Sequence, residues 1–253
     1  AHIDHIGRIP MLYRSGFRGT IYATPPTKDF SEVLLLDSEH ILSQEADRHH
    51  KPPLFSVDDI RGSMELWKTV GFFTQFKVGN ITAEFSRAGH ILGSASIRLT
   101  IEGKRILFSG DLGNSPAPII GERDDALPAD YCLIESVYGD RLHDRRANQQ
   151  KDAIENLIED VGKKKGALVI PAFAMERTQK LLYDIDALIT QGRVPRMPTF
   201  LDSPLAIKLT GVYKKYEDYF DKEAKKLIAS GDKLFNFPGL KTTLTTEESK
   251  SIN

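Results

Sequence analysis

Several features that mark particular classes of protein are missing from this sequence of 253 residues. A single cysteine, Cys132, excludes an internal disulfide and favours a reducing, cytoplasmic location. The sequence has no apolar run of about 18 residues, so no membrane-spanning helix is predicted. The net charge of −1 gives no overall attraction to nucleic acid, and any such contact must come from local patches. These absences indicate a globular protein whose chemistry is concentrated in a local site.

The composition is otherwise ordinary. Apolar residues make up 40% of the chain and charged residues 27%, as in typical globular proteins. The length is sufficient for one large domain or two modest ones with a sizeable core. Cys132 lies in the apolar run 131–134, and we therefore expect its thiol to be buried and inert.

The first half of the chain is predicted to join helices to a block of strands. Helices are expected at 6–15, at 26–48 and after Ser56, which forms a capping pattern with Asp59. β-Branched and aromatic residues predict a strand at 19–23, and a block of strands is expected at 71–78, 80–87, 95–102 and 104–109. Turn residues separate these strands at Gly79-Asn80 and at Glu102-Gly103.

Strands and helices alternate in the second half of the chain. Strands are expected at 130–135, 167–171 and 199–202, the second of them buried. Helices are expected at 147–162, 175–191 and 205–219. This alternation predicts a partly parallel α/β sheet, with a domain boundary near residue 175.

The chain opens with a dense group of metal-ligand residue types. His2, Asp4 and His5 place two imidazoles and a carboxylate in one short segment, where they can converge on a cation. Two later residues, His90 and Asp111, each stand beside glycines just after a predicted strand. Alone, His90 is typical of a loop histidine and Asp111 of a turn aspartate. The three segments together predict a metal site on loops at the ends of strands.

These motifs resemble those of the metallo-β-lactamase superfamily, whose signature is His-x-His-x-Asp-His followed by a separate His, a separate Asp and a final His. Three further segments resemble its β-CASP branch, the nucleases of RNA processing and DNA repair, including RNase J-like and cleavage-and-polyadenylation endonuclease-like enzymes. They are residues 135–141, 171–174 and 201–206. The resemblance extends from residue 1 to about residue 220.

The resemblance implies an α/β fold, an αββα metallo-β-lactamase sandwich with an inserted α/β β-CASP domain. Residues 1–174 would form part of the first and residues 175–253 part of the second. The first histidine of the signature would precede Ala1, and the final one would follow Asn253. We therefore expect an internal portion of a longer enzyme, one that binds metal weakly by itself.

A two-zinc site is also implied by the resemblance. His2 and His90 would bind one zinc, Asp4 and His5 the other, and Asp111 would bridge the two. Asp4 and Glu135 would take part in catalysis, Glu135 being the acidic residue of the first β-CASP motif. A structural alternative for Glu135 is a carboxylate bonded to backbone amides.

Two residues of the second half are candidates for substrate binding. Ser203 precedes a predicted helix, where a hydroxyl and backbone amides can bind phosphate. Arg177 near another helix start can contact a phosphate. An ordinary helix cap and a surface charge are the alternatives, and Glu176 stands where many relatives have glycine. We expect His143 to be a surface residue.

The function implied is that of a zinc-dependent ribonuclease, which hydrolyses RNA phosphodiester bonds by a two-metal hydroxide mechanism. RNA would be its partner, and the resemblance allows a homodimer or a subunit of a processing complex. Three alternatives stay open: a DNA-processing nuclease, another hydrolase of the same fold, and a non-catalytic RNA-binding scaffold.

Overall fold

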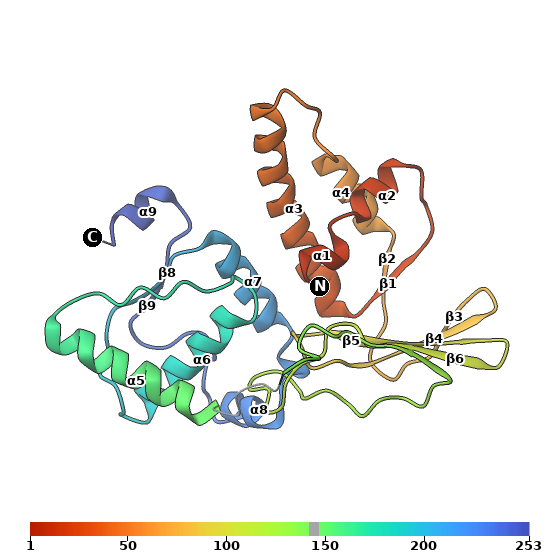
Figure 1. Cartoon of the computed structure of the whole chain (residues 1–253). Helices are drawn as coiled ribbons and strands as arrows, with labels where there is room; N and C mark the ends of the chain where they lie inside the picture. The colour runs from red at the N-terminus through yellow and green to blue at the C-terminus, as the bar shows by residue number, and fades with distance from the viewer. Residues whose placement is uncertain (142–146, 253) are drawn as a thin grey trace. The chain divides into compact units, whose positions relative to one another are not determined.

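A computed structural model describes residues 1–141 and 147–252 of the chain (Figure 1). The chain divides into two compact units, each described by itself below. Unit 1 contains residues 1–115 and 122–135, and unit 2 contains residues 116–121 and the chain from Ser136 onward. The chain finally passes from unit 1 to unit 2 at residues 135–136. The domain boundary near residue 175 stays a prediction.

Five strands form the main sheet of unit 1, in the order β3-β4-β5-β6-β7. The first four pair antiparallel, and β7 pairs parallel to β6. They span Phe76–Val78, Ile81–Arg87, Ala95–Ile101, Lys104–Phe108 and Tyr131–Leu133. The predicted turns are confirmed: Glu102 and Gly103 both have positive φ, 49° and 78°, as a tight two-residue hairpin requires. Of the strand expected at 71–78, only the last three residues are extended.

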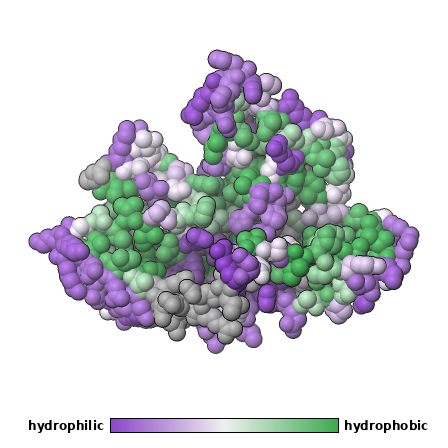
Figure 2. Space-filling model, viewed as in Figure 1, coloured by the Kyte–Doolittle hydropathy of each residue, from purple (hydrophilic) through white to green (hydrophobic). Residues whose placement is uncertain are grey.

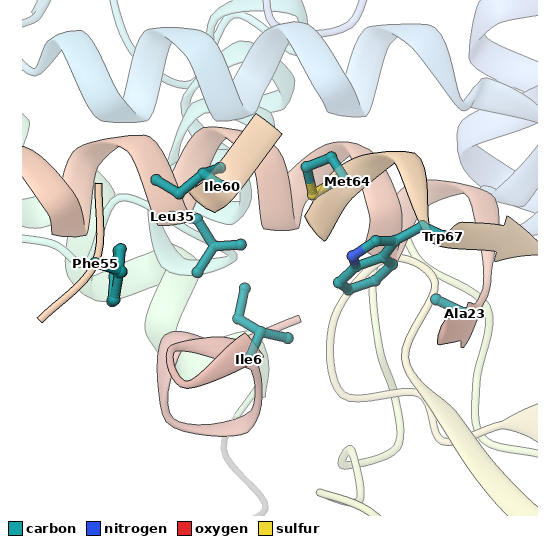
Figure 3. Close-up of a cluster of buried hydrophobic side chains, with 7 residues drawn as sticks. All are labelled: Ile6, Ala23, Leu35, Phe55, Ile60, Met64 and Trp67. Carbon is teal, nitrogen blue, oxygen red and sulfur yellow. The ribbon is translucent and has the colours of Figure 1, made fainter. Parts of the chain in front are cut away.

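A smaller parallel pair, β1 (Ile21–Ala23) and β2 (Trp67–Thr69), lies under the helices of unit 1. These helices are α1 (Ile3–Ile6), α2 (Ile9–Arg14), α3 (Pro25–Arg48) and α4 (Val57–Glu65). Their apolar faces and the pair enclose one buried cluster (Figure 3), made of Ile6, Ala23, Leu35, Phe55, Ile60, Met64 and Trp67. The single helix expected at 6–15 is thus two short helices. The capping box of Ser56 and Asp59 is confirmed.

The two sheets of unit 1 meet through aromatic side chains. Alternation along β1 sends Ala23 into the helical cluster, while Tyr22 stacks on Phe76 of β3 with ring centroids 4.6 Å apart. Phe76 in turn packs edge-on against Phe85 of β4, at 5.2 Å. Unit 1 therefore has a helical layer and two sheet layers, in agreement with three layers of the predicted αββα sandwich.

Unit 2 is mostly helical. Its elements are α5 (Ala147–Lys164), α6 (Arg177–Thr190), β8 (Thr199–Leu201), α7 (Pro204–Lys215), a 3₁₀ turn (Glu217–Tyr219), α8 (Lys222–Ala229), β9 (Leu240–Thr242) and α9 (Thr246–Lys250). Strands β8 and β9 pair parallel. Arg193 joins the end of α6 to α5 through ion pairs with Asp152 and Glu155. Figure 2 shows hydrophilic side chains along the outer side of α5.

Two sequence predictions about burial are wrong. The segment 167–171 is not a strand, and most of its residues are exposed, with Val169 84% exposed. Cys132 is also exposed, as are its neighbours Tyr131 and Leu133 on β7. Both segments are apolar runs, and an apolar run is buried only where another element covers it; no such cover is found among the described residues. None of the described helices has the length and apolar character that crossing a membrane requires.

Candidate metal centre

The first candidate ligands come from the start of unit 1. His2 is the N-cap of α1, with extended backbone angles, and its carbonyl accepts a hydrogen bond from the amide of His5 at 3.0 Å. This short helical turn brings the imidazoles of His2 and His5 toward the same carboxylate. Asp4 lies on the same turn, and its side chain is 76% exposed.

The carboxylate of Asp111 is the centre of the cluster. Its Oδ2 atom lies 3.0 Å from Nε2 of His5, 3.8 Å from Nδ1 of His2 and 3.8 Å from Nε2 of His90. The ligand atoms of His2, His90 and Asp111 all lie within 4.8 Å of one another. Asp4 reaches the group through His5, with 3.6 Å between its Oδ2 and the His5 Nε2. The structure therefore brings His2, His5 and His90 to Asp111 from three distant parts of the sequence, and Asp4 adjoins this group only through His5.

Glycines allow the His90 and Asp111 loops to approach each other. The amide of Gly113 donates to the carbonyl of Ala88 at 2.8 Å. A Cβ on Gly113 would lie only 1.7 Å from the carbonyl oxygen of Gly89, so no other residue fits there without moving one loop. Gly89 also has a positive φ of 67°, which glycine adopts at little cost. The glycines beside His90 and Asp111 are thus needed for the backbones to meet.

Serine side chains hold both loops in shape. Ser94 Oγ accepts hydrogen bonds from the amides of His90 and Ile91, at 3.0 and 3.2 Å. On the other loop, Ser96 Oγ donates to the carbonyl of Ser109 at 2.7 Å. Sequence reasoning missed these positioning residues. For Ser94 the signal was its place four residues after His90, a spacing at which a hydroxyl can bond back to the backbone.

Glu135 supports the loop of Asp111 from the end of β7. Its Oε1 accepts a hydrogen bond from the amide of Leu112 at 2.9 Å, and its own amide donates to Ser109 Oγ at 3.0 Å. The carboxylate therefore takes the structural position considered for it, bonded to a backbone amide, one residue from Asp111. Its part in catalysis stays a prediction.

The surroundings of His2 favour its neutral form. Burial lowers the pKa of His2 below its ordinary value, and the neighbouring His90 ring, whose centroid is 5.0 Å away, lowers it further. A neutral imidazole is the form that binds a metal ion. Three imidazoles and two carboxylates supply the nitrogen and oxygen donors that zinc accepts, so the residues present fit the implied metal.

Comparison with known proteins agrees with these motifs. Residues 178–253 match the family model described as the Beta-Casp domain. Over its whole length the chain is 34% identical to ribonuclease TTHA0252 of Thermus thermophilus, of which it covers 56%. It is 32% identical to an RNase J-like protein of Methanocaldococcus jannaschii, over 90% of this chain and 51% of that protein. The chain therefore carries a Beta-Casp domain in its second half. It spans about half the length of these two relatives.

Two eukaryotic proteins are also similar to the chain. It is 27% identical to endoribonuclease YSH1 of Saccharomyces cerevisiae, over 89% of this chain and 30% of that protein. The chain is also 27% identical to cleavage and polyadenylation specificity factor 73 of Drosophila melanogaster, over 90% of this chain and 33% of that protein. The matched Beta-Casp domain and the mixture of helices and strands confirm the predicted α/β metallo-β-lactamase fold with a β-CASP insertion.

The two candidate substrate residues of the β-CASP region lie at helix starts in unit 2. Ser203 is the N-cap of α7, and its Oγ accepts a hydrogen bond from the amide of Ala206 at 3.2 Å. Arg177 opens α6, and its guanidinium lies 5.4 Å from the ring centre of the exposed Phe173. Ser203 therefore acts as a helix cap, and phosphate binding by either residue stays a prediction. His143 lies outside the described residues.

Proposed function

We propose that the whole protein is a zinc-dependent ribonuclease that hydrolyses phosphodiester bonds of RNA. The observation that carries the proposal is the meeting of His2, His5 and His90 around the single carboxylate of Asp111. The names of the relatives support RNA as the substrate, since they include a ribonuclease and an endoribonuclease.

Each residue of the centre has a proposed role. His2 and His90 would hold one zinc ion, Asp4 and His5 would hold the second, and Asp111 would be a ligand shared by both. When bound, the pair of ions supplies a hydroxide at neutral pH and stabilises the charge that develops on the phosphate. Net addition of one water would break the P–O3′ bond: the water oxygen would stay on the downstream 5′-phosphate, and a proton would go to the upstream 3′-hydroxyl.

Two further carboxylates, those of Glu135 and Asp4, have proposed roles at the candidate metal centre. Glu135 accepts a hydrogen bond from the amide of Leu112 and so would fix the direction of Asp111, the proposed shared ligand. Asp4 is more exposed than the other ligands, with 76% of its side chain accessible, and is proposed to act in catalysis on the side open to solvent. In the β-CASP region, Arg177 and Ser203 are proposed to contact the backbone of the RNA strand.

Asp111→Ala in the whole protein tests the proposal. We expect RNA cleavage to fall by three orders of magnitude or more, because a shared ligand supports several kcal/mol of transition-state stabilisation. Bound zinc, measured by elemental analysis, should fall as well. Asp58→Ala is the matched control, since Asp58 is a 91% exposed carboxylate on α4. Near-normal cleavage by folded Asp111→Ala would overturn the two-metal mechanism, and cleavage of single-stranded DNA in preference to RNA would overturn the substrate.

A further inference from the structure

An open recess lies beside the candidate metal centre in unit 1. Its volume is about 380 Å³, and it reaches the side chains of Asp4 and His5. The rest of its lining comes from α2 and the residues at the two ends of that helix: Arg8, Ile9, Met11, Leu12 and Ser15. Sites for small ligands commonly have volumes of about 300–1,000 Å³, with apolar walls and a few polar groups. The recess has this size and this mixture of groups.

Packing behind α2 keeps the wall of the recess in place. Arg8, Leu12 and Ser15 are spaced by four and three residues, so they share one side of the helix. On its other sides Pro10 is fully buried, and the ring of Tyr13 occupies the space in front of Gly62 on α4. A Cβ on Gly62 would meet that ring at 2.3 Å, which shows how closely α2 and α4 approach. Figure 1 shows the two helices side by side.

The guanidinium of Arg8 is available to an anion. Among the described residues, its side chain makes one hydrogen bond, from Nη1 to the sulfur of Met11 at 3.1 Å, and a thioether is a weak acceptor. Arg87 and Arg105, other arginines of unit 1, are instead paired with the carboxylates of Asp124 and Asp130. A guanidinium without a carboxylate partner, next to a proposed phosphate-cleaving centre, matches the charge and geometry of a phosphate group.

We propose that this recess, the α2 recess, binds the nucleotide next to the phosphate that is cleaved. Ile9, Met11 and Leu12 would contact the base, and Arg8 the phosphate of that nucleotide. This inference rests on the proposed ribonuclease function. It places the part of the substrate strand that continues beyond the metal centre in the α2 recess. Because three of the lining side chains are apolar and Arg8 contacts phosphate, the α2 recess positions the strand without selecting its sequence.

Salt dependence of RNA binding tests the role of Arg8. Binding of the whole protein to a short single-stranded RNA is measured at several salt concentrations, with the metal chelated so that the strand stays intact. Arg8→Ala is expected to weaken binding and to lower the slope of log affinity against log salt by about 0.7, as for one lost phosphate contact on a single strand. Arg8→Lys should keep the slope. Arg61→Ala removes an exposed arginine on α4 and should change neither quantity.

The contact with the base is tested with RNAs that lack one base at successive positions around the cleavage point. For the unmodified protein, loss of the base at one position beside the cleaved phosphate should weaken binding. In Leu12→Ala, the same loss should weaken binding less, because the contact is already gone. Leu12 is 48% exposed, so this variant is expected to fold normally. Equal losses in both proteins at every position would show that the α2 recess holds no base.

The outcomes separate the α2 recess from the ribonuclease function. If the unmodified protein cleaves RNA while Arg8→Ala has the affinity and salt slope of Arg61→Ala, the proposal for the α2 recess is wrong and the ribonuclease proposal stands. If the unmodified protein neither binds nor cleaves RNA, the proposed function fails and the α2 recess loses its ligand with it.

Discussion

Because Gly113 lies in close contact with Gly89, we expect a single methyl group added at residue 113 to disturb both loops of the candidate metal centre. In Gly113→Ala the new Cβ would lie 1.7 Å from the Gly89 carbonyl oxygen and 2.7 Å from the amide nitrogen of His90. An ordinary contact begins at 3.4 Å, so one loop must move by about 1.7 Å, the difference between 3.4 and 1.7 Å. The hydrogen bond from Gly113 to Ala88 would be lost in that movement.

The cost can be worked out from these two effects. Overpacking at a rigid contact costs about 1–3 kcal/mol, and the lost hydrogen bond costs about 1 kcal/mol more. We therefore expect Gly113→Ala to lower the free energy of unfolding by about 2–4 kcal/mol. This is a fall of roughly 5–15 °C in melting temperature for a chain of this size. Because this movement also increases the distance between Asp111 and His90, we expect the affinity for zinc to fall as well.

Thermal unfolding and zinc titration, with a matched glycine as control, check this prediction. Gly211 lies on the exposed side of α7 with nothing within 4 Å of its added Cβ. Gly211→Ala should therefore stabilise the protein, by up to about 1 kcal/mol, through helix propensity alone. If Gly113→Ala melts at the temperature of the unmodified protein and binds zinc as tightly, the close approach of the two loops is not what forms the site.

Two further predictions concern unit 2. Glu176 has φ 66° and ψ −61°, and the amide of Arg177 bonds to the carbonyl of Met175, which together define a strained γ-turn. Glu176→Gly should raise stability by about 1 kcal/mol, and an unchanged or lower melting temperature would contradict the strain. Burial, together with the smaller effect of the nearby Asp232, raises the pKa of Asp186 to about 6. The folded state therefore binds this proton more tightly than the unfolded state, so the stabilisation is complete below the ordinary pKa of 3.8 and is lost as the pH rises through 6. Asp186→Asn should accordingly raise the melting temperature at pH 8 but not at pH 4, and an equal gain at both values would show that the carboxylate is not the cause.

The sequence was most informative where local chemistry decides the structure. The hairpin at Glu102-Gly103 and the start of α3 after Thr24 follow from turn and cap residues, and both were predicted within a residue or two. The spacing of His2, Asp4 and His5 likewise indicated a shared site, because residues so close along the chain cannot separate far in space.

It was least informative where burial depends on distant segments. Cys132 and Val169 lie in apolar runs typical of interior strands, yet both residues are exposed. Burial of such a run requires another element to pack against it, and the sequence of the run alone does not determine whether one does. Strand β2 was missed for a related reason. Its three residues have little pattern of their own and are extended because Trp67 pairs with Ile21 of β1.

Residues 116–121 belong to unit 2 although the chain on both sides of them belongs to unit 1. Within them Ile119 and Ile120 are buried, the amide of Asp221 bonds to the carbonyl of Ile119 at 2.8 Å, and Ile120 forms a β-bridge with Phe220. Phe220 is synthesised 220 − 120 = 100 residues after Ile120. At ordinary rates of protein synthesis, this takes about 5–20 s. During that interval two isoleucines in the middle of an emerging chain lack the partners that will bury them. Translation speed between residues 120 and 220 therefore sets how long this apolar segment is exposed to chaperones or to misfolding.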